Sequence, residues 1–331
     1  MLPFYRLLIK RAWRLSLKYK WLWLFGIFAA LLGQGGVYEF IFRIFNNLST
    51  GQSLFYTLQE YANSGILGMI SWGKLQELWV SDLSGLAMGI FSLLFALCLL
   101  GVMISLSVIG QAGLVKGAIG LQEGKKLGIK ECFREGLKHF WSVLEINFIT
   151  KVVLLGLLLL ITYIVSLIPV TSTWGNTILF AVFFVFFVVV GIIIYFLTLY
   201  GTAYAVLRGQ HTFQALNSAW KIFKKNIVAN LEMGAIVFIL NIVIAIGASI
   251  GAFIVLAPFI LIYFILLFTN AALVFAIYNV FMIALVFVVF LALCAWYNTF
   301  QVSLWMMLFE ELALDKVKPK IVRVLEHWSK K

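Results

Sequence analysis

One uninterrupted apolar run constrains this chain more than any other feature. From Met233 to Phe309 the sequence contains no Asp, Glu, Lys, Arg or His. A transmembrane helix needs about 20 consecutive apolar residues, so this run is long enough for two helices that cross a bilayer. Three further uncharged stretches, 21–38, 83–115 and 152–207, meet or approach the required length. The chain is therefore predicted to cross a membrane several times.

Composition supports an all-α, polytopic membrane helical bundle. Hydrophobic residues make up 63% of the chain, charged residues 11%, and the mean hydropathy is +1.06. Pro169 and the polar residues after it divide one apolar run, and Pro258 divides another. The piece 259–270 that follows Pro258 is interfacial, re-entrant or part of a longer helix. Six spans are predicted, at about 21–45, 86–112, 148–168, 177–204, 228–257 and 271–304.

The positive charges give an orientation. Of the 25 Lys and Arg residues, all but Arg43 and Lys74 lie on one side of the six-span arrangement. The positive-inside rule then places both termini in the cytoplasm and the protein in the cell membrane. The net charge of +12 is thus typical of a membrane protein that contacts the anionic lipids of the inner leaflet, and nucleic acid is not an expected partner.

A basic amphipathic segment lies before the longest apolar run. In it, Phe213, Leu216, Trp220, Phe223 and Ile227 recur at steps of three and four residues, with lysines on the rest of the helical wheel. This spacing predicts a helix in the membrane interface, with its apolar face about 5 to 10 Å deep in the acyl boundary.

Similar segments occur at 129–144 and 4–19, and each leads into a predicted span. Chance similarity among basic amphipathic segments is one explanation. We favour three repeats of an amphipathic helix followed by a transmembrane hairpin, within a single membrane domain of residues 1–331. The expected repeats are about 1–112, 113–205 and 206–310, followed by a basic cytoplasmic tail, 311–331. The expected lipid-headgroup anchors on the amphipathic segments are Trp13, Lys18, Lys138, Trp141, Trp220, Lys221, Lys224 and Lys225.

The stretch "AYAVLRGQHTFQALNSAWKIFKKN" resembles a signature of the membrane domain attached to some bacterial glycerophosphodiester phosphodiesterases. The same domain occurs alone in many uncharacterised six-span prokaryotic proteins. The resemblance covers about residues 85–310 and implies an all-helical membrane module. Arg208 stands where the family tends to have an acidic residue. The resemblance does not imply phosphodiesterase activity, because the clustered carboxylates and histidines of the catalytic barrel are absent. The resembling residues are Tyr204, Leu207, Gly209, Ala215, Leu216, Ser218, Trp220 and Lys221.

Polar residues at membrane depth are the candidate functional side chains. Glu145 and Glu232 each follow an amphipathic segment, near the start of a span. One interpretation is a pair of carboxylates that coordinates a cation or a proton in a polar vestibule; the other is headgroup-level carboxylates paired with nearby lysines. Asn147, Asn241 and Asn270 either line a pathway or hydrogen-bond between helices.

The sequence provides little for catalysis. His139, His211 and His327 are isolated, and the three cysteines do not cluster with them. No HExxH or GxSxG motif occurs. We therefore expect no enzyme activity, no cofactor and no metal site.

Three function classes follow. We favour a non-enzymatic membrane protein that acts on or with lipid, as an envelope-associated scaffold or assembly factor. The alternative is a transporter or channel with a pathway between repeated hairpins, and an intramembrane enzyme is least favoured. Glycine pairs such as Gly113 with Gly117 and Gly247 with Gly251 let helices approach closely, either within one chain or in a homo-oligomer. A different membrane protein is an equally compatible partner.

Overall fold

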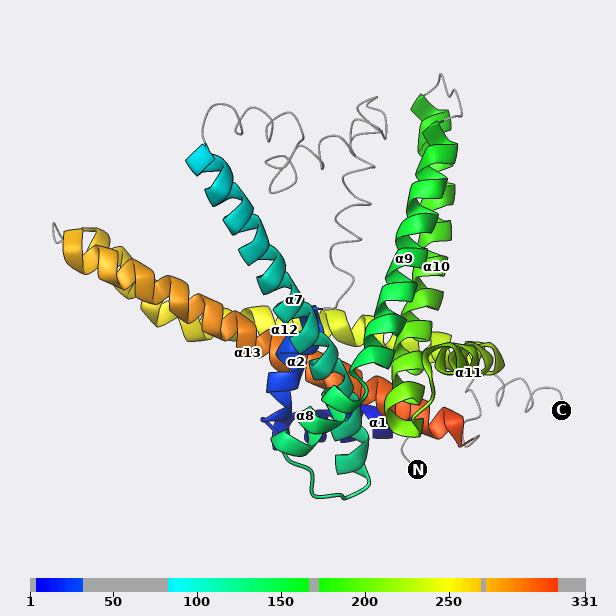
Figure 1. The fold of residues 1–331 in the computed structure, drawn as a ribbon. Helices are drawn as coiled ribbons and strands as arrows, with labels where there is room; N and C mark the ends of the chain where they lie inside the picture. Colours follow the sequence, from blue (N-terminus) through cyan, green and yellow to red (C-terminus); the bar gives the residue numbers. More distant parts are fainter. Residues whose placement is uncertain (1–3, 32–82, 167–172, 269–271, 315–331) are drawn as a thin grey trace.

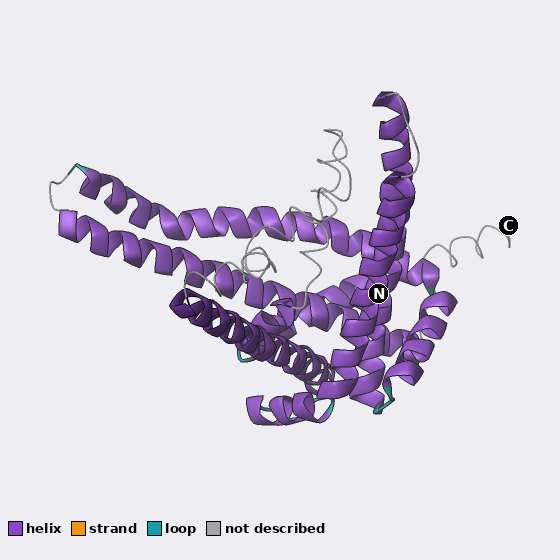
Figure 2. Ribbon diagram, turned by 45° about the horizontal axis from the view of Figure 1, so that its top comes forward, coloured by secondary structure: helices purple, strands orange, loops and turns teal. Residues whose placement is uncertain are grey.

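The computed structural model describes residues 4–31, 83–166, 173–268 and 272–314, and all secondary structure in these ranges is helical (Figures 1 and 2). The predicted all-α fold is confirmed. The helices of the described ranges are α1 (Phe4–Lys18), α2 (Leu22–Leu31), α7 (Leu83–Gln122), α8 (Ile129–Lys138), α9 (Phe140–Ser166), α10 (Thr173–Arg208), α11 (Thr212–Lys225), α12 (Ile227–Leu267) and α13 (Ala272–Ala313).

Short amphipathic helices precede long apolar ones along the chain. Only His139 separates α8 from α9, and only Asn226 separates α11 from α12. Each of these two short helices leads into a pair of long helices, which matches the predicted order of an amphipathic helix and a hairpin. The first predicted span, 21–45, lies mostly outside the described residues. The architecture of three repeats stays a prediction.

Five of the described helices, α7, α9, α10, α12 and α13, are long and apolar enough to cross a membrane. Two of these helices extend beyond the membrane spans that were predicted within them. The spans expected at 86–112 and 271–304 belong to helices that run to Gln122 and Ala313. Apolar runs mark only the lipid-facing length of a helix, and these helices continue into segments that carry charged residues.

The predicted break at Pro258 was wrong, because α12 continues through it to Leu267. A proline removes one backbone hydrogen bond, and a neighbouring helix can stabilise such a site in lipid. Here α13 packs alongside, and the Tyr278 hydroxyl donates to the carbonyl of Phe259 at 2.7 Å. The described part of 259–270 thus belongs to a longer helix. At about 1.5 Å per residue α12 is about 60 Å long, roughly twice the thickness of a bilayer's hydrocarbon core.

The protein core lies at one end of the long helices. We call this region the packed end; it comprises α1, α2, α8 and α11, residues 105–122 of α7, the first turns of α9 and α12, and the last turns of α10 and α13. The large side chains that are fully buried here include Leu8, Tyr200 and Phe300. Away from the packed end, α7, the α9–α10 hairpin and the α12–α13 hairpin diverge (Figure 1). The most apolar stretch of α12 has no residue buried within this chain, as is typical of a helix that crosses a membrane.

Two glycines lie where the backbone of one helix of the packed end approaches another helix closely. A Cβ atom on Gly26 of α2 would lie 2.3 Å from Thr299 Oγ1 and 2.5 Å from the carbonyl oxygen of Ala295, both in α13. A Cβ atom on Gly136 of α8 would lie 2.7 Å from the carbonyl oxygen of Ile109 in α7. Any larger residue at either position has to push the two helices apart.

One of the two predicted glycine pairs lies at a helix contact, and the other does not. Gly113 and Gly117 face α2, where added Cβ atoms would lie 2.8 Å from the Phe25 ring and 2.7 Å from Leu22. Gly247 lies open, with nothing within 4 Å of an added Cβ, and the same is true of its predicted partner. The GxxxG spacing therefore identified one close helix contact within this chain and did not identify another.

Candidate functional site

Helix α8 keeps its large apolar side chains exposed. Ile129, Phe133 and Leu137 recur every four residues, and Trp141 of α9 follows at the same step; all four are exposed, Trp141 by 70%. The opposite face of α8 carries the small residues Cys132 and Gly136, which are buried against α7. Lys130, Arg134 and the predicted anchor Lys138 are exposed beside the apolar row. This arrangement is typical of a helix that lies in a membrane interface.

Helix α11 repeats this design only in part. Its small residues Ala215 and Ala219 are buried, while Phe213 is 78% exposed and Trp220 is 38% exposed. Phe223, which the spacing placed on the lipid-facing row, is instead buried, with its ring 5.3 Å from that of Phe196 in α10. The Lys224 ammonium lies 5.4 Å above the centre of the Trp220 ring, within the range of a cation–π contact. The other predicted anchors on this helix, Lys221 and Lys225, are also exposed.

Helix α1 uses its apolar face differently. Its expected apolar row is present, but Leu8, Ala12 and Leu15 are buried, because α1 packs on α13 and α7. The predicted anchor Trp13 makes edge-to-face contacts with Trp296 and Phe300 of α13, at ring-centre distances of 5.0 and 5.6 Å. The side chains that were expected to enter lipid are therefore largely covered by protein.

The basic end of α1 is open to its surroundings. Lys18, the other predicted anchor on this helix, is exposed, and its ammonium lies 5.3 Å from the centre of the Tyr19 ring. A lysine beside an aromatic ring at a helix end suits the headgroup layer.

The two candidate carboxylates tie helices together. The Thr212 hydroxyl, at the start of α11, donates to Glu145 Oε2 at 2.5 Å. A carboxylate at this position also suits the positive end of the α11 dipole. The Tyr5 hydroxyl of α1 donates to Glu232 Oε2 of α12 at 2.6 Å. The two carboxylates thus have separate partners on separate helices, and these contacts do not form a paired site.

Of the three candidate asparagines, the two that the structure describes lie in different surroundings. Asn147 is buried and donates to Gln111 Oε1 of α7 at 2.8 Å, as expected for a hydrogen bond between helices. Asn241 is half-buried in α12. Asn270 lies outside the described residues.

Sequence reasoning missed a second polar contact between helices. The Tyr200 hydroxyl of α10 donates to Asn230 Oδ1 of α12 at 2.6 Å, and both side chains are fully buried. The Asn230 Nδ2 atom is buried without a hydrogen-bond partner. The signal was present, since Asn230 lies three residues before the apolar run, but its position resembled that of a headgroup-level residue.

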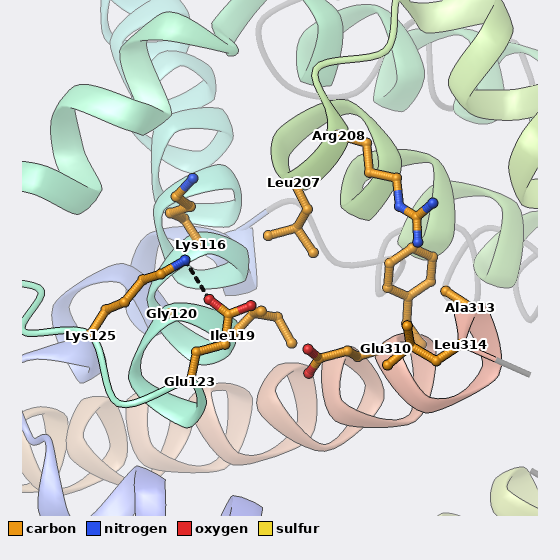
Figure 3. A pocket seen from close by; sticks show the side chains of 11 residues that line it. Lys116, Ile119, Gly120, Glu123, Lys125, Leu207, Arg208, Glu310, Ala313 and Leu314 are labelled. Atoms are coloured by element: carbon orange, nitrogen blue, oxygen red, sulfur yellow. Dashed lines mark ion pairs between the residues drawn. The ribbon is translucent and has the colours of Figure 1, made fainter. Parts of the chain in front are cut away.

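A polar cavity of about 230 Å³ opens at the packed end, between the last turns of α7, α10 and α13 (Figure 3). Its charged lining consists of Lys116, Glu123, Lys125, Arg208 and Glu310. The Lys125 ammonium is paired with Glu123 at 2.5 Å. Arg208 ends α10, and its guanidinium lies 5.4 Å from the centre of the Tyr204 ring. Neither Glu145 nor Glu232 lines this cavity.

Local backbone structure places Lys125 beside the cavity. Gly124, with φ of +80°, ends α7, and the Lys125 N–H donates to the carbonyl of Gly120 at 2.9 Å. This is the hydrogen-bond pattern of a glycine-terminated helix, in which a positive φ favours glycine. Gly209, with φ of +63°, follows Arg208 in the same way at the end of α10.

The cavity residue Lys116 and the histidine His139 both lie close to the carboxylate of Glu135 in α8. Glu135 Oε2 lies 3.7 Å from both Lys116 Nζ and His139 Nε2. Burial lowers the pKa of His139, with smaller contributions from its charged neighbours. Burial raises the pKa of the Cys132 thiol to about 11, so it stays protonated and unreactive at neutral pH.

The fold and these surfaces define a multi-pass α-helical membrane protein. Comparisons with known protein families, curated proteins and solved structures found no match. In the part of the chain that the structure describes, no three His, Cys, Asp or Glu side chains are grouped to hold a metal ion.

Proposed function

We propose that this protein acts with membrane lipid as a non-enzymatic scaffold or assembly factor of the cell envelope. The exposed apolar row from Ile129 of α8 to Trp141 of α9 carries the proposal, because water would make this exposure costly and a bilayer would not. Basic residues flank the row, as they do on α11. Such faces bind the surface of a bilayer that contains anionic lipid.

The packed end is proposed to face the cytoplasm. It carries the lysines and arginines of α1, α8 and α11, and the positive-inside rule assigns such clusters to the cytoplasmic side. Each basic residue next to an anionic leaflet adds roughly 1 kcal/mol of binding free energy. The three short helices would then hold the long helices at a fixed depth, with both termini in the cytoplasm.

A transporter or channel is less well supported than lipid binding. That alternative depended on repeated hairpins, on a discontinuity at Pro258 and Asn270 and on membrane-depth carboxylates. Helix α12 is continuous at Pro258, and Asn270 lies outside the described residues. Glu145 and Glu232 bond to Thr212 and Tyr5. The repeated hairpins and the polar cavity of the packed end give this alternative its remaining support.

Native mass spectrometry of the protein released from membranes tests lipid binding. We expect retained phospholipid, and fewer lipids bound to a Phe133→Ser variant. Phe268→Ser is the matched control, since Phe268 is also exposed but lies at the far end of the α12–α13 hairpin. A protein that retains no lipid, together with an unchanged membrane lipid composition when the protein is deleted from its cell, would contradict the proposal.

A further inference from the structure

The charges around the polar cavity do not balance. Three cations, Lys116, Lys125 and Arg208, face two carboxylates, Glu123 and Glu310. In Figure 3 the Glu310 carboxylate points from α13 across the cavity toward α7, while Arg208 extends from α10 on the other side. With all five groups charged, the lining has an excess of one positive charge.

Two of the three cations have donors available for a ligand. Arg208 makes no ion pair with any described residue. Its guanidinium lies over the Tyr204 ring. Lys116 Nζ lies 3.7 Å from Glu135, beyond the usual range of a direct hydrogen bond. Guanidinium groups bind the oxygens of phosphate in a bidentate manner, and lysine adds a point charge. Lys125 is already paired closely with Glu123.

The position of the cavity indicates where its ligand comes from. Lys116, Arg208 and Glu310 lie near the ends of the apolar helices α7, α10 and α13, at the level where a bilayer presents its headgroups. Apolar side chains, including Leu207 and Leu314, complete the lining. The volume of about 230 Å³ is below the range of roughly 300–1,000 Å³ typical of sites that enclose a whole drug-sized ligand.

We propose that this cavity binds the phosphodiester headgroup of an anionic phospholipid, with Arg208 and Lys116 as its phosphate ligands. One phosphodiester carries one negative charge, which the Arg208 guanidinium can balance, whereas Lys116 already has Glu135 nearby and would add donors to the phosphate. The acyl chains would stay in the bilayer, so the cavity has to accommodate the headgroup alone. This inference rests on the proposed lipid-binding function and specifies one site and one lipid class for it.

The experiment measures lipid binding to the full chain in detergent micelles by native mass spectrometry, with phosphatidylglycerol and phosphatidylethanolamine as probes. We expect preferential binding of phosphatidylglycerol and about a tenfold loss of its affinity in Arg208→Gln. Lys126→Gln is the matched control, because Lys126 is exposed in the turn after α7 and does not line the cavity, and we expect less than a twofold change there. Equal losses in the two variants would overturn the proposal.

A second variant distinguishes the loss of a phosphate ligand from misfolding of the protein. Glu123→Gln removes a carboxylate from an exposed turn and releases Lys125, so it should tighten phosphatidylglycerol binding severalfold, which misfolding would not do. Unchanged or weaker binding would count against the site. Inorganic phosphate is the competing probe: if millimolar phosphate binds to the unaltered protein but not to Arg208→Gln, and phosphatidylglycerol does not displace it, the cavity is a site for free phosphate and the lipid assignment is wrong. Lipid that is retained but insensitive to residue 208 overturns this inference alone, whereas no retained lipid contradicts the proposed function as well.

Discussion

Helices α1 and α8 have the same sequence pattern but contact their surroundings in opposite ways. Both are short, basic and amphipathic, and each comes before long apolar helices. In α1 the large apolar residues Leu8 and Leu15 are buried in the core, whereas in α8 Phe133 and Leu137 are exposed. The buried face of α8 consists instead of Cys132 and Gly136.

The size of the buried residues explains the difference. Small residues let helix backbones approach each other, as between membrane helices, and they leave the large side chains free to enter lipid. Helix α11 is intermediate, because it buries Ala215 and Ala219 but also the larger Ile222 and Phe223. The core face of α1 instead uses Leu8 and Leu15, as a helix of a soluble protein does. We therefore expect α1 to contribute mainly to folding, and α8 and α11 to contribute to lipid contact.

The largest expected effect comes from truncating the buried row of α1. Leu8 is 1% exposed, so Leu8→Ala should lower the free energy of unfolding by about 2–5 kcal/mol. Phe133→Ala on the exposed row of α8 should change it by only about 0.5 kcal/mol. Unfolding in mixed detergent micelles, followed by circular dichroism, measures both. Equal losses would show that α8 also contributes to the core.

Gly136 tests whether α8 depends on close contact with α7. Gly136→Ala introduces a Cβ atom 2.7 Å from the carbonyl oxygen of Ile109, and we expect a loss of about 1–3 kcal/mol from the resulting overpacking. Gly247→Ala is the control, since nothing lies within 4 Å of the added atom. There the higher helix propensity of alanine should leave stability unchanged or raise it by up to about 1 kcal/mol. The same unfolding assay separates the two, and a neutral Gly136→Ala would mean that α8 can shift without cost.

A polar contact also ties α1 to the bundle, and its loss should have a smaller effect. Tyr5→Phe removes the hydrogen bond to Glu232, at a cost of about 1 kcal/mol for this partly buried pair. Thr212→Val removes the equivalent bond between α11 and Glu145, and we expect a similar cost. Tyr19→Phe is the control for loss of a tyrosine hydroxyl. If Tyr5→Phe and Tyr19→Phe have the same stability, Glu232 does not hold α1 in place.

Much of this architecture follows from the sequence, because hydrophobic periods report which face of a helix is apolar. They do not report what covers that face. The pattern of α1 predicted an apolar row correctly and its surroundings incorrectly, since Trp296 and Phe300, which contact Trp13, lie almost the whole chain length away. Glu145 and Glu232 were identified as notable, but their partners depend on tertiary packing. The cavity was missed for the same reason, because Lys116, Arg208 and Glu310 come from three distant helices.

The smallest expected effect is on the pH dependence of stability, and it distinguishes the junction after α8 from the junction after α11. His139 follows α8, where Asn226 follows α11, so His139→Asn gives both junctions the same residue. Because burial lowers the pKa of His139 below its ordinary value of 6.5, the folded state binds fewer protons than the unfolded state just below pH 6.5. The stability of the unaltered protein should therefore fall as the pH drops through this interval, by less than the one-proton limit of about 1.4 kcal/mol per pH unit. The Glu135 carboxylate raises the pKa of His139 and so opposes this pH dependence, whereas Lys116 and Lys138 lower it and reinforce the dependence.

Thermal unfolding in detergent measures this pH dependence. Between pH 7.5 and pH 5.5, roughly the range in which histidine titrates, stability should decline more steeply for the unaltered protein than for His139→Asn. Parallel curves would mean that protonation of His139 does not affect the junction between α8 and α9.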